Sequence, residues 1–220
     1  MDIHNNALLE LRPVYHAAPL QYLPSILASG ELRSKRRVGY SMARPTARKR
    51  DIALGLGDYI HCSFERQSPI VLDKLKKGYP HVVLQFDSAR LTDVDCALLP
   101  CSTKAWRSKW QCVPVSDPLD MARLMRLYSQ CGRFHGMEIL VKGALPLDSL
   151  VRIETSSMEE YRLVEKISQR LPLRNDVSIE LVEPPPILKY AAKNLSVIAE
   201  YFELCCRVEI DLAIPILPFD

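Results

Sequence analysis

One carboxylate stands inside a run of residues that otherwise predicts a buried strand. The run HGMEILVKGALPLDSLV covers residues 135–151, and Glu138 interrupts its apolar part. An ionised carboxylate among apolar side chains is costly unless something binds it. Side chains alternate along a strand, so Glu138 shares a face with Leu140 and Lys142, and Met137, Ile139 and Val141 share the other face. Either Glu138 faces solvent and pairs with Lys142, or it binds a ligand.

Two other segments bring polar side chains to the ends of predicted strands. His16 follows Tyr15 just before a predicted helix, in YHAAPLQYLPSILASGEL. Residues 57–70, GDYIHCSFERQSPI, combine a Gly-Asp turn, an aromatic strand and the start of a helix. Taken alone, His16 is better explained as a core or surface histidine than as a ligand-binding residue. Together with Glu138 and the segment 57–70, however, His16 becomes a candidate for a functional role.

Basic side chains gather in two further segments. Residues 33–50 contain eight Lys and Arg and no acidic residue, and residues 104–110, KAWRSKW, interleave three cations with both tryptophans of the chain. Cations meet phosphates and aromatic rings stack on bases, so this composition favours a surface for a nucleic-acid strand. The alternative is a solvated loop and two core tryptophans.

The elements that must position these residues are strands and helices in similar number. Strands are predicted at 13–17, 58–64, 81–86, 137–143, 150–155, 177–183 and 207–214, and helices at 19–30, 68–78, 117–130, 157–171 and most of 184–205. Gly30 is expected to end the first helix, and Ser68 and Asp117 to cap two others. Residues 31–58 and 92–116 lack a clear period and are expected to be irregular. We predict one α+β domain over 1–220 with a mixed central sheet.

Composition limits the classes of protein to consider. The chain has 220 residues, of which 48% are hydrophobic and 25% charged, and a net charge of +3. These values are typical of a globular protein, and no apolar run reaches the roughly 18 residues that cross a bilayer. The N-terminus lacks the basic start and apolar core of a secretory signal. Seven cysteines without a CxxC pair indicate free thiols and no metal site, so we expect a cytoplasmic protein.

The ordered segments resemble the motifs of DarT-type nucleic-acid ADP-ribosyltransferases. That family shows a Tyr-His-Ile-Thr start, an Ile-Leu-x-x-Gly-Leu helix end, a Gly-Asp-Tyr-Val-Pro-Phe-Tyr-Phe-x-x-x-Ser-Pro block and a late Glu-Val-Leu-Val strand. The corresponding segments here are Tyr15-His16, SILASGEL, GDYIHCSFERQSP and MEILV. Each motif alone is weak, and their order and spacing carry the resemblance, over residues 12–90 and 130–185. It implies an ADP-ribosyltransferase-like fold, with a mainly antiparallel sheet flanked by helices, and NAD as substrate.

The resemblance also implies roles for single residues. Glu138 is expected to be the catalytic glutamate, and Arg50 the catalytic arginine of a loop that closes over NAD. Arg48 is the alternative, because this loop is shorter than in the family. The other expected NAD-binding residues are His16 at a ribose, Ser63 and Phe64 at the position whose aromatic rings enclose the nicotinamide, and Gly30 in the helix-end motif. Only Phe64 keeps a ring.

The chemistry of NAD cleavage explains why a carboxylate is needed. Breaking the bond between nicotinamide and ribose builds positive charge on the ribose. A carboxylate can hold the ribose 2′-hydroxyl and stabilise that charge, as carboxylates do in glycosidases. An arginine can hold the pyrophosphate. On this hypothesis Glu138 has a function inside its strand.

Departures from the family concern the acceptor. The family's mid-chain Thr-Asp-Gly-Asn-Ala segment is replaced by LLPCSTKAWRSKWQC, and the loop that selects the acceptor corresponds to about 117–135. The acceptor is expected to be a base of single-stranded DNA, with RNA and the identity of the base left open. The residues expected to bind the nucleic acid are Arg44, Lys49, Trp106, Arg107, Lys109, Arg126 and Arg133.

A toxin of a toxin–antitoxin or phage-defence system is the biological role that the resemblance implies, with an antitoxin protein as partner. Two other functions compete with transfer to nucleic acid. One is transfer of ADP-ribose to a protein. The other is a non-enzymatic binding module, in which Glu138 and His16 are structural and binding is salt-sensitive.

Overall fold

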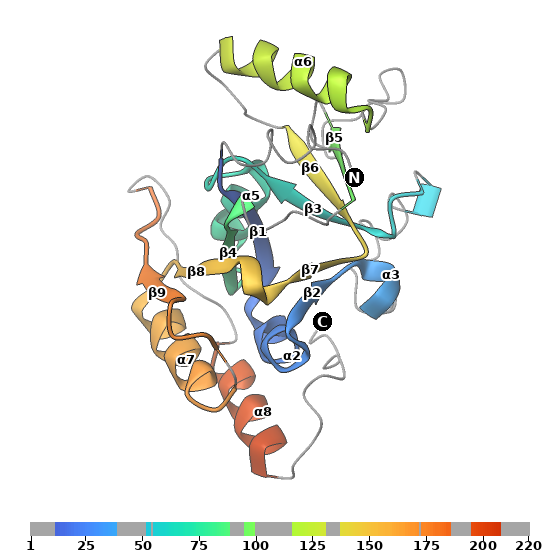
Figure 1. The fold of residues 1–220 in the computed structure, drawn as a ribbon. Coiled ribbons are helices and arrows are strands. Elements are labelled where there is room, and N and C mark those ends of the chain that lie inside the picture. Colours follow the sequence, from blue (N-terminus) through green and yellow to red (C-terminus); the bar gives the residue numbers. More distant parts are fainter. Residues whose placement is uncertain are drawn as a thin grey trace.

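The computed structural model describes residues 12–38, 52–53, 55–88, 95–99, 116–130, 137–171, 173–185 and 195–207. A seven-stranded sheet lies at its centre (Figure 1). The strands run in the order β5-β6-β3-β1-β4-β8-β9, and all neighbours are antiparallel except β8 and β9. Their bounds are β1 Val14–Pro19, β3 Tyr59–Ser63, β4 His81–Phe86, β5 Cys96–Leu99, β6 Glu138–Lys142, β8 Leu150–Thr155 and β9 Ser178–Leu181. The predicted α+β fold with a mixed, mainly antiparallel sheet is confirmed.

A second, two-stranded sheet joins β2 (Glu31–Arg33) to β7 (Ala144–Pro146). β7 follows β6 after a single residue, Gly143, at which the chain leaves the large sheet. The φ of Gly143 is +81°, a conformation that side chains with a Cβ rarely adopt. A Cβ there would also lie 3.1 Å from the guanidinium of Arg37, which is exposed and could move aside, so it is the turn that requires glycine.

Helices pack on both faces of the large sheet. The helices are α2 (Leu23–Ser29), α3 (Lys35–Val38), α5 (Pro69–Lys77), α6 (Pro118–Gln130), α7 (Met158–Ser168) and α8 (Leu195–Arg207), with single 3-10 turns at η1 (Leu20–Tyr22) and η5 (Leu147–Ser149). In Figure 1, α7 and α8 lie together at the β9 end of the sheet, and α6 lies at the end formed by β5 and β6. The sheet thus carries different helices at its two ends.

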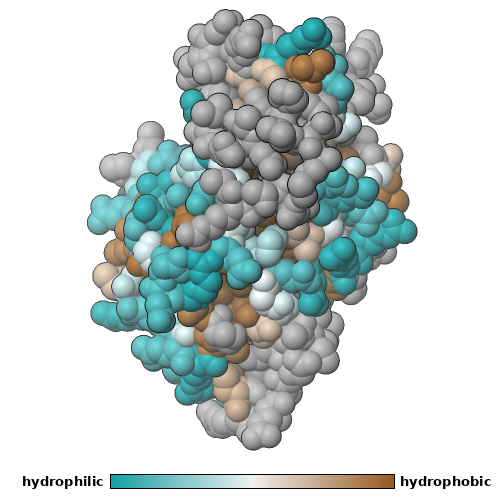
Figure 2. Space-filling model, in the orientation of Figure 1, coloured by the Kyte–Doolittle hydropathy of each residue, from teal (hydrophilic) through white to brown (hydrophobic). Residues whose placement is uncertain are grey.

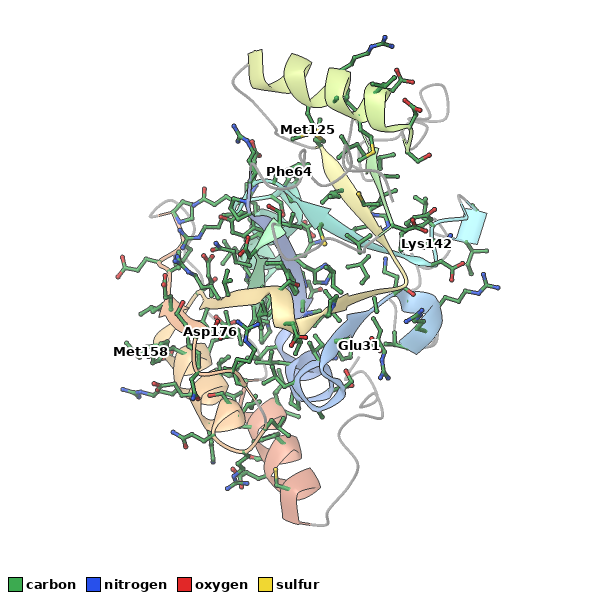
Figure 3. All side chains as sticks on the ribbon, viewed as in Figure 1. Glu31, Phe64, Met125, Lys142, Met158 and Asp176 are labelled. Carbon is green, nitrogen blue, oxygen red and sulfur yellow. The ribbon has the colours of Figure 1, made fainter. Side chains whose placement is uncertain are left out.

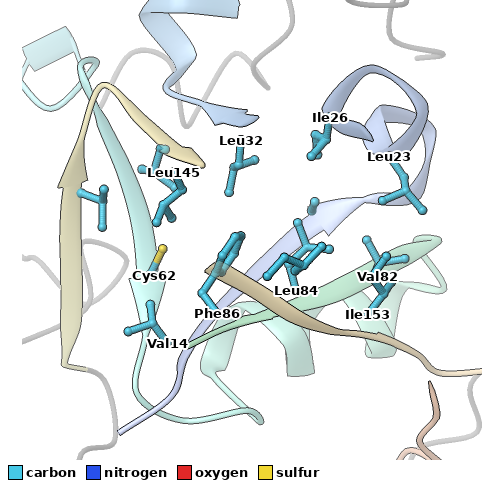
Figure 4. Packing of buried hydrophobic residues seen from close by; sticks show 14 of the residues in the cluster. Val14, Leu23, Ile26, Leu32, Cys62, Val82, Leu84, Phe86, Leu145 and Ile153 are labelled. Carbon is cyan, nitrogen blue, oxygen red and sulfur yellow. The ribbon is translucent and has the colours of Figure 1, made fainter. Parts of the chain in front are cut away.

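The main hydrophobic core lies on one face of the sheet, which we call the core face. Figure 4 shows Val14, Cys62 and Phe86 of neighbouring strands among its buried side chains. Residues of α2, α6, α7 and α8 complete this cluster. Because side chains alternate along each strand, every second strand residue faces this core and the others face the opposite side.

The opposite face carries two small apolar clusters instead of one large core. On β4, Val83 packs with Val71 and Leu75 of α5. At the other end, Leu99 of β5 and Leu140 of β6 pack with two further buried residues. The residues of β3 that point to this face lie between the two clusters.

The predicted elements agree with most of this structure. The strands 13–17, 58–64, 81–86, 137–143, 150–155 and 177–183 are present, and Ser68 caps α5 by accepting from the Val71 amide. Irregular structure over 31–58 and 92–116 was wrong where β2, α3 and β5 form. These elements have three or four residues, too few to show a period, and pairing with a neighbouring strand defines β2 and β5. The strand predicted at 207–214 lies outside the described residues, apart from Arg207 at the end of α8.

Hydrophobic surface on the face in Figure 2 occurs as small patches between hydrophilic side chains. Among the described residues, the large exposed apolar side chains belong to separate segments, and they are Ile52, Tyr79, Leu119, Met158 and Val197. Within the described ranges, no helix is long and apolar enough to cross a bilayer.

Glu160 at the start of α7 joins that helix to β4. Its side chain is fully buried, and its two carboxylate oxygens accept from the amides of His81 (3.1 Å) and Ser156 (3.0 Å). The hydroxyl of Ser157, the N-cap residue, accepts from the Glu160 amide, which caps the start of α7. This carboxylate is therefore structural.

We predict that Glu160→Ala lowers the free energy of unfolding by about 2–4 kcal/mol, because two buried amides lose their acceptor. Urea denaturation measures the change. Glu159→Ala, on the same turn but exposed, is the control and is expected to change stability by less than about 0.5 kcal/mol. Equal effects of the two substitutions would contradict the structural role of Glu160.

Candidate active site

Four polar residues follow one another across three strands on the face opposite the main core. Strand register places Glu138 opposite Ser63, and Ser63 opposite Tyr15, so the three side chains point to the same face. His61, two residues before Ser63, points the same way. We call Glu138, His61, Ser63 and Tyr15 the polar strip. It lies between the two small apolar clusters of that face.

Glu138 is buried, with 4% of its surface exposed. Its Oε2 accepts a hydrogen bond from Nδ1 of His61 at 2.8 Å. Its Oε1 is buried and has no hydrogen-bond partner among the described residues. The alternative of a solvent-facing glutamate paired with Lys142 is therefore wrong, and Lys142 lies 3.7 Å from Asp95 instead.

His16 is connected to the same site through the backbone of His61. Its Nδ1 donates to the His61 carbonyl at 2.9 Å. Burial lowers the pKa of His16 from 6.5 to about 4, so the ring is neutral at pH 7 and its Nε2 is an acceptor. A ribose hydroxyl is a suitable donor to such an atom.

The position of His16 differs from that of the strip residues. It follows Tyr15, so its side chain projects to the core face of β1. β1 pairs with β4 along its whole length, but with β3 only at Tyr15 and Ser63. The ladder between β1 and β3 is therefore short. Beyond its end, the His61 carbonyl accepts a hydrogen bond from the His16 ring.

Three of the four other expected NAD-binding residues lie in the described part of the chain, and their surroundings are those of ordinary structural residues. Ser63 accepts from the Glu65 amide at 3.0 Å and stands beside Glu138. Phe64 is 5% exposed and belongs to the main core with Met125 of α6, as Figure 3 shows at the end of β3. Gly30 ends α2 with φ +70°, and a Cβ there meets nothing within 4 Å. Its backbone conformation therefore explains this glycine without a ligand.

A second polar group on the same face anchors the segment that follows β3. Arg66 donates through Nε to Glu154 of β8 at 2.6 Å. Burial raises the pKa of Glu154, and Arg66 opposes that rise. Burial also raises the pKa of Tyr15, with Glu154 adding to the effect. This pair fixes the end of β3 against the β8 side of the sheet.

The thiols near the strip do not provide nucleophiles. Cys62 faces the core, and burial raises the pKa of its thiol far above the usual range, with Glu138 adding to the rise. Burial and the neighbouring Asp95 raise the pKa of Cys96 to about 11. The thiolate is the reactive form, so both residues are unreactive at neutral pH. Within the described ranges, no group of three or more acidic, histidine or cysteine side chains could hold a metal ion.

Most of the expected arginine and nucleic-acid contacts fall outside the described residues. These are Arg44, Arg48, Lys49, Arg50, Trp106, Arg107, Lys109 and Arg133. Arg126 lies in α6, and its side chain is outside the described part. The segment 117–135, expected as the loop that selects the acceptor, is helix over Pro118–Gln130.

His61 is the site residue that sequence reasoning missed. In the family block a proline stands where this chain has His61, so the resemblance assigned it no role. A signal was available, because His61 has the same strand parity as Ser63 and the strand 137–143 was already predicted. Finding it required the pairing of those two strands, which no local pattern gives.

The strip can hold a hydroxyl group and stabilise positive charge. Glu138 offers one free acceptor, Oε1, in surroundings that exclude water, while Oε2 is held by His61. In such surroundings a fixed charge acts more strongly on a developing cation than it does in water.

Comparison with solved structures finds the same fold in DarT proteins. Thermus sp. 2.9 DarT in complex with ADP-ribosylated ssDNA matches with a TM-score of 0.60 and 17% identity over 78% of this chain and 94% of that chain. The same protein in complex with NAD+ matches at 0.56 and 16%, over 79% and 96%. Thermosipho africanus DarTG in complex with ADP-ribose matches at 0.54 and 14%, over 83% of this chain and 52% of that chain.

Sequence comparisons add nothing to this, since neither a family model nor a curated protein matches the chain. The fold that the motifs implied, that of DarT-type ADP-ribosyltransferases, is confirmed.

We predict that stability falls as the pH is lowered from about 6.5 to about 4, because the fully buried His81 and the partly buried His16 are held in neutral form. Burial lowers the pKa of His81 to about 4 as well. Between these pH values the unfolded chain binds more protons than the folded one. Each histidine therefore contributes its full stability above about pH 6.5, and this contribution, roughly 3 kcal/mol at most, is lost as the pH falls towards 4. Urea denaturation at several pH values measures the slope.

His81→Asn is the matched variant, because the amide keeps a donor for the Tyr79 carbonyl that His81 Nδ1 reaches at 2.9 Å. Its stability should vary less between pH 6.5 and 4 than that of the wild type. An identical pH dependence would show that His81 is not buried as a neutral ring.

Proposed function

We propose that this protein is an NAD-dependent mono-ADP-ribosyltransferase that attaches ADP-ribose to a base of single-stranded nucleic acid, with DNA favoured over RNA. The observation that carries the proposal is Glu138, a buried carboxylate with one oxygen held by His61 and the other without a partner among the described residues. It stands in the fold of proteins solved with NAD+ and with ADP-ribosylated ssDNA.

The proposed reaction breaks one bond and forms one at the same carbon. The bond between C1′ of the ribose and the nicotinamide nitrogen breaks, and its electron pair leaves with neutral nicotinamide. A nitrogen or oxygen atom of the nucleic-acid base then bonds to C1′ and loses a proton to solvent or to a basic group. Glu138 holds the 2′-hydroxyl through Oε1 and stabilises the charge that develops on the ribose.

His16 is the second proposed NAD-binding residue, and it leaves β1 on the core face, beyond the end of the short ladder with β3. Its neutral ring leaves Nε2 as an acceptor for a second ribose hydroxyl. It is joined to Glu138 through the backbone and side chain of one residue, His61. Arg50, or Arg48 in its place, is proposed to hold the pyrophosphate from the loop before β3.

Two features favour nucleic acid as the acceptor. One structure with this fold contains ADP-ribosylated ssDNA. The basic segments 33–50 and 104–110 have the cations and the two tryptophans that suit phosphates and bases. A protein that modifies nucleic acid in its own cell needs restraint, so we also propose a toxin role with an antitoxin as partner.

We predict that Glu138→Gln lowers the rate of ADP-ribose transfer to an oligonucleotide at least about 100-fold, because the amide cannot stabilise positive charge as the carboxylate does. The assay incubates the protein with NAD and short single-stranded DNA and RNA, and mass spectrometry measures the gain of one ADP-ribose.

Glu160→Gln is the control, since it also replaces a buried carboxylate but lies in α7, away from the strip. Its activity per folded molecule should remain near that of the wild type. Equal labelling by Glu138→Gln and wild type would show that Glu138 is not catalytic. In a cell lysate supplied with NAD and the oligonucleotides, label found on protein and on neither oligonucleotide would instead select a protein acceptor.

A further prediction separates the two candidate arginines. Arg50→Ala is expected to raise the KM for NAD at least about tenfold, because it removes a charged hydrogen bond to a phosphate, and Arg48→Ala to change it by less than about threefold. Steady-state release of nicotinamide measures both. The reverse order of effects would assign the role to Arg48.

A further inference from the structure

We infer that His61 is a positioning residue for Glu138, an inference that rests on the proposed function. The family motif carries proline at this position, so the contact is a feature of this chain and not of the motif. Nδ1 of His61 and Oε2 of Glu138 are 2.8 Å apart, and their side chains are 10% and 5% exposed. Water therefore contributes little to solvating this carboxylate, and the hydrogen bond from the imidazole replaces it.

The contact decides which carboxylate oxygen faces the substrate. A carboxylate is stabilised by a donor on either oxygen, and here His61 occupies Oε2. Oε1 is the oxygen left to accept from the ribose 2′-hydroxyl. Rotation of the carboxylate would break the bond to His61, so the imidazole fixes Oε1 in one direction before substrate binds.

His61 occupies the central strand of the three that build the site. Its side chain reaches β6 and its carbonyl accepts from His16 of β1. Ser63, of the same strand and face, lies opposite Glu138 in the ladder but accepts from the Glu65 amide. Among the described residues, the only hydrogen bond to the Glu138 carboxylate in the structure comes from His61.

The test compares three substitutions of His61 that differ in their donor. His61→Leu removes the donor, His61→Asn keeps an N–H at the position of Nδ1, and His61→Gln moves the N–H farther along the side chain. Steady-state transfer of ADP-ribose from NAD to a single-stranded oligonucleotide gives kcat and the KM for NAD. Thermal unfolding reports the folding of each variant.

We expect His61→Leu and His61→Gln to lower kcat by roughly 10- to 100-fold, with the KM for NAD changed by less than about threefold. His61→Asn should recover kcat to within about fivefold of the wild type. His81→Leu is the control, because it also removes a buried imidazole, on β4 and away from the strip. It should alter thermal stability but leave the kcat of the folded protein near that of the wild type.

Two results with the His61 variants would overturn the inference. Wild-type kcat in His61→Leu means that Glu138 needs no positioning. Equal losses of kcat in the Asn and Gln variants, in step with equal losses of thermal stability, mean that His61 is only structural.

Should His61→Leu fail to fold, the ratio of the kcat values of the Asn and Gln variants decides alone. Inactive Glu138→Gln beside active His61→Leu rejects only the role of His61, whereas an inactive wild type rejects the proposed function and with it this inference.

Discussion

The site depends on one buried carboxylate, that of Glu138. Placing Glu138 in the sheet removes its hydration, and an ionised carboxylate without compensation is among the most expensive groups to bury. One hydrogen bond from His61 offsets part of that cost, and Oε1 is left buried without a partner among the described residues. A folded protein gains nothing from such an arrangement, since an apolar residue of similar size costs less. The cost is understandable if Oε1 acquires its partner from a substrate.

The rest of the sheet is built around that site. β3 lies between β1 and β6 and carries the residue that contacts both, while its ladder with β1 is limited to one pair. Apolar clusters pack on either side of the strip, and the Arg66–Glu154 pair ties the end of β3 to β8. A second buried glutamate, Glu160, shows the contrast. Each of its oxygens accepts from a backbone amide, so both are already used within the fold.

Sequence alone could predict the fold class and the strand that carries Glu138, because alternation, helix caps and proline positions are local signals. The short elements β2, β5 and β7 could not be predicted, since pairing with distant strands defines them. The same limit applies to His61: its partner is 77 residues away, and strand register alone brings them together. The roles expected for Ser63, Phe64 and Gly30 came from their correspondence to the family motifs. In the structure, Ser63 accepts from a backbone amide, Phe64 is a core ring, and Gly30 ends a helix. Phe64 in particular faces Met125 in the core, not the strip.

The most direct measurement is a crystal structure of the protein with an NAD analogue that cannot be cleaved. The account predicts that Oε1 of Glu138 accepts from the 2′-hydroxyl of the nicotinamide ribose at about 2.5–2.8 Å, with His61 still bound to Oε2. A dinucleotide bound elsewhere, with Oε1 still buried and without a contact to it, would contradict the account.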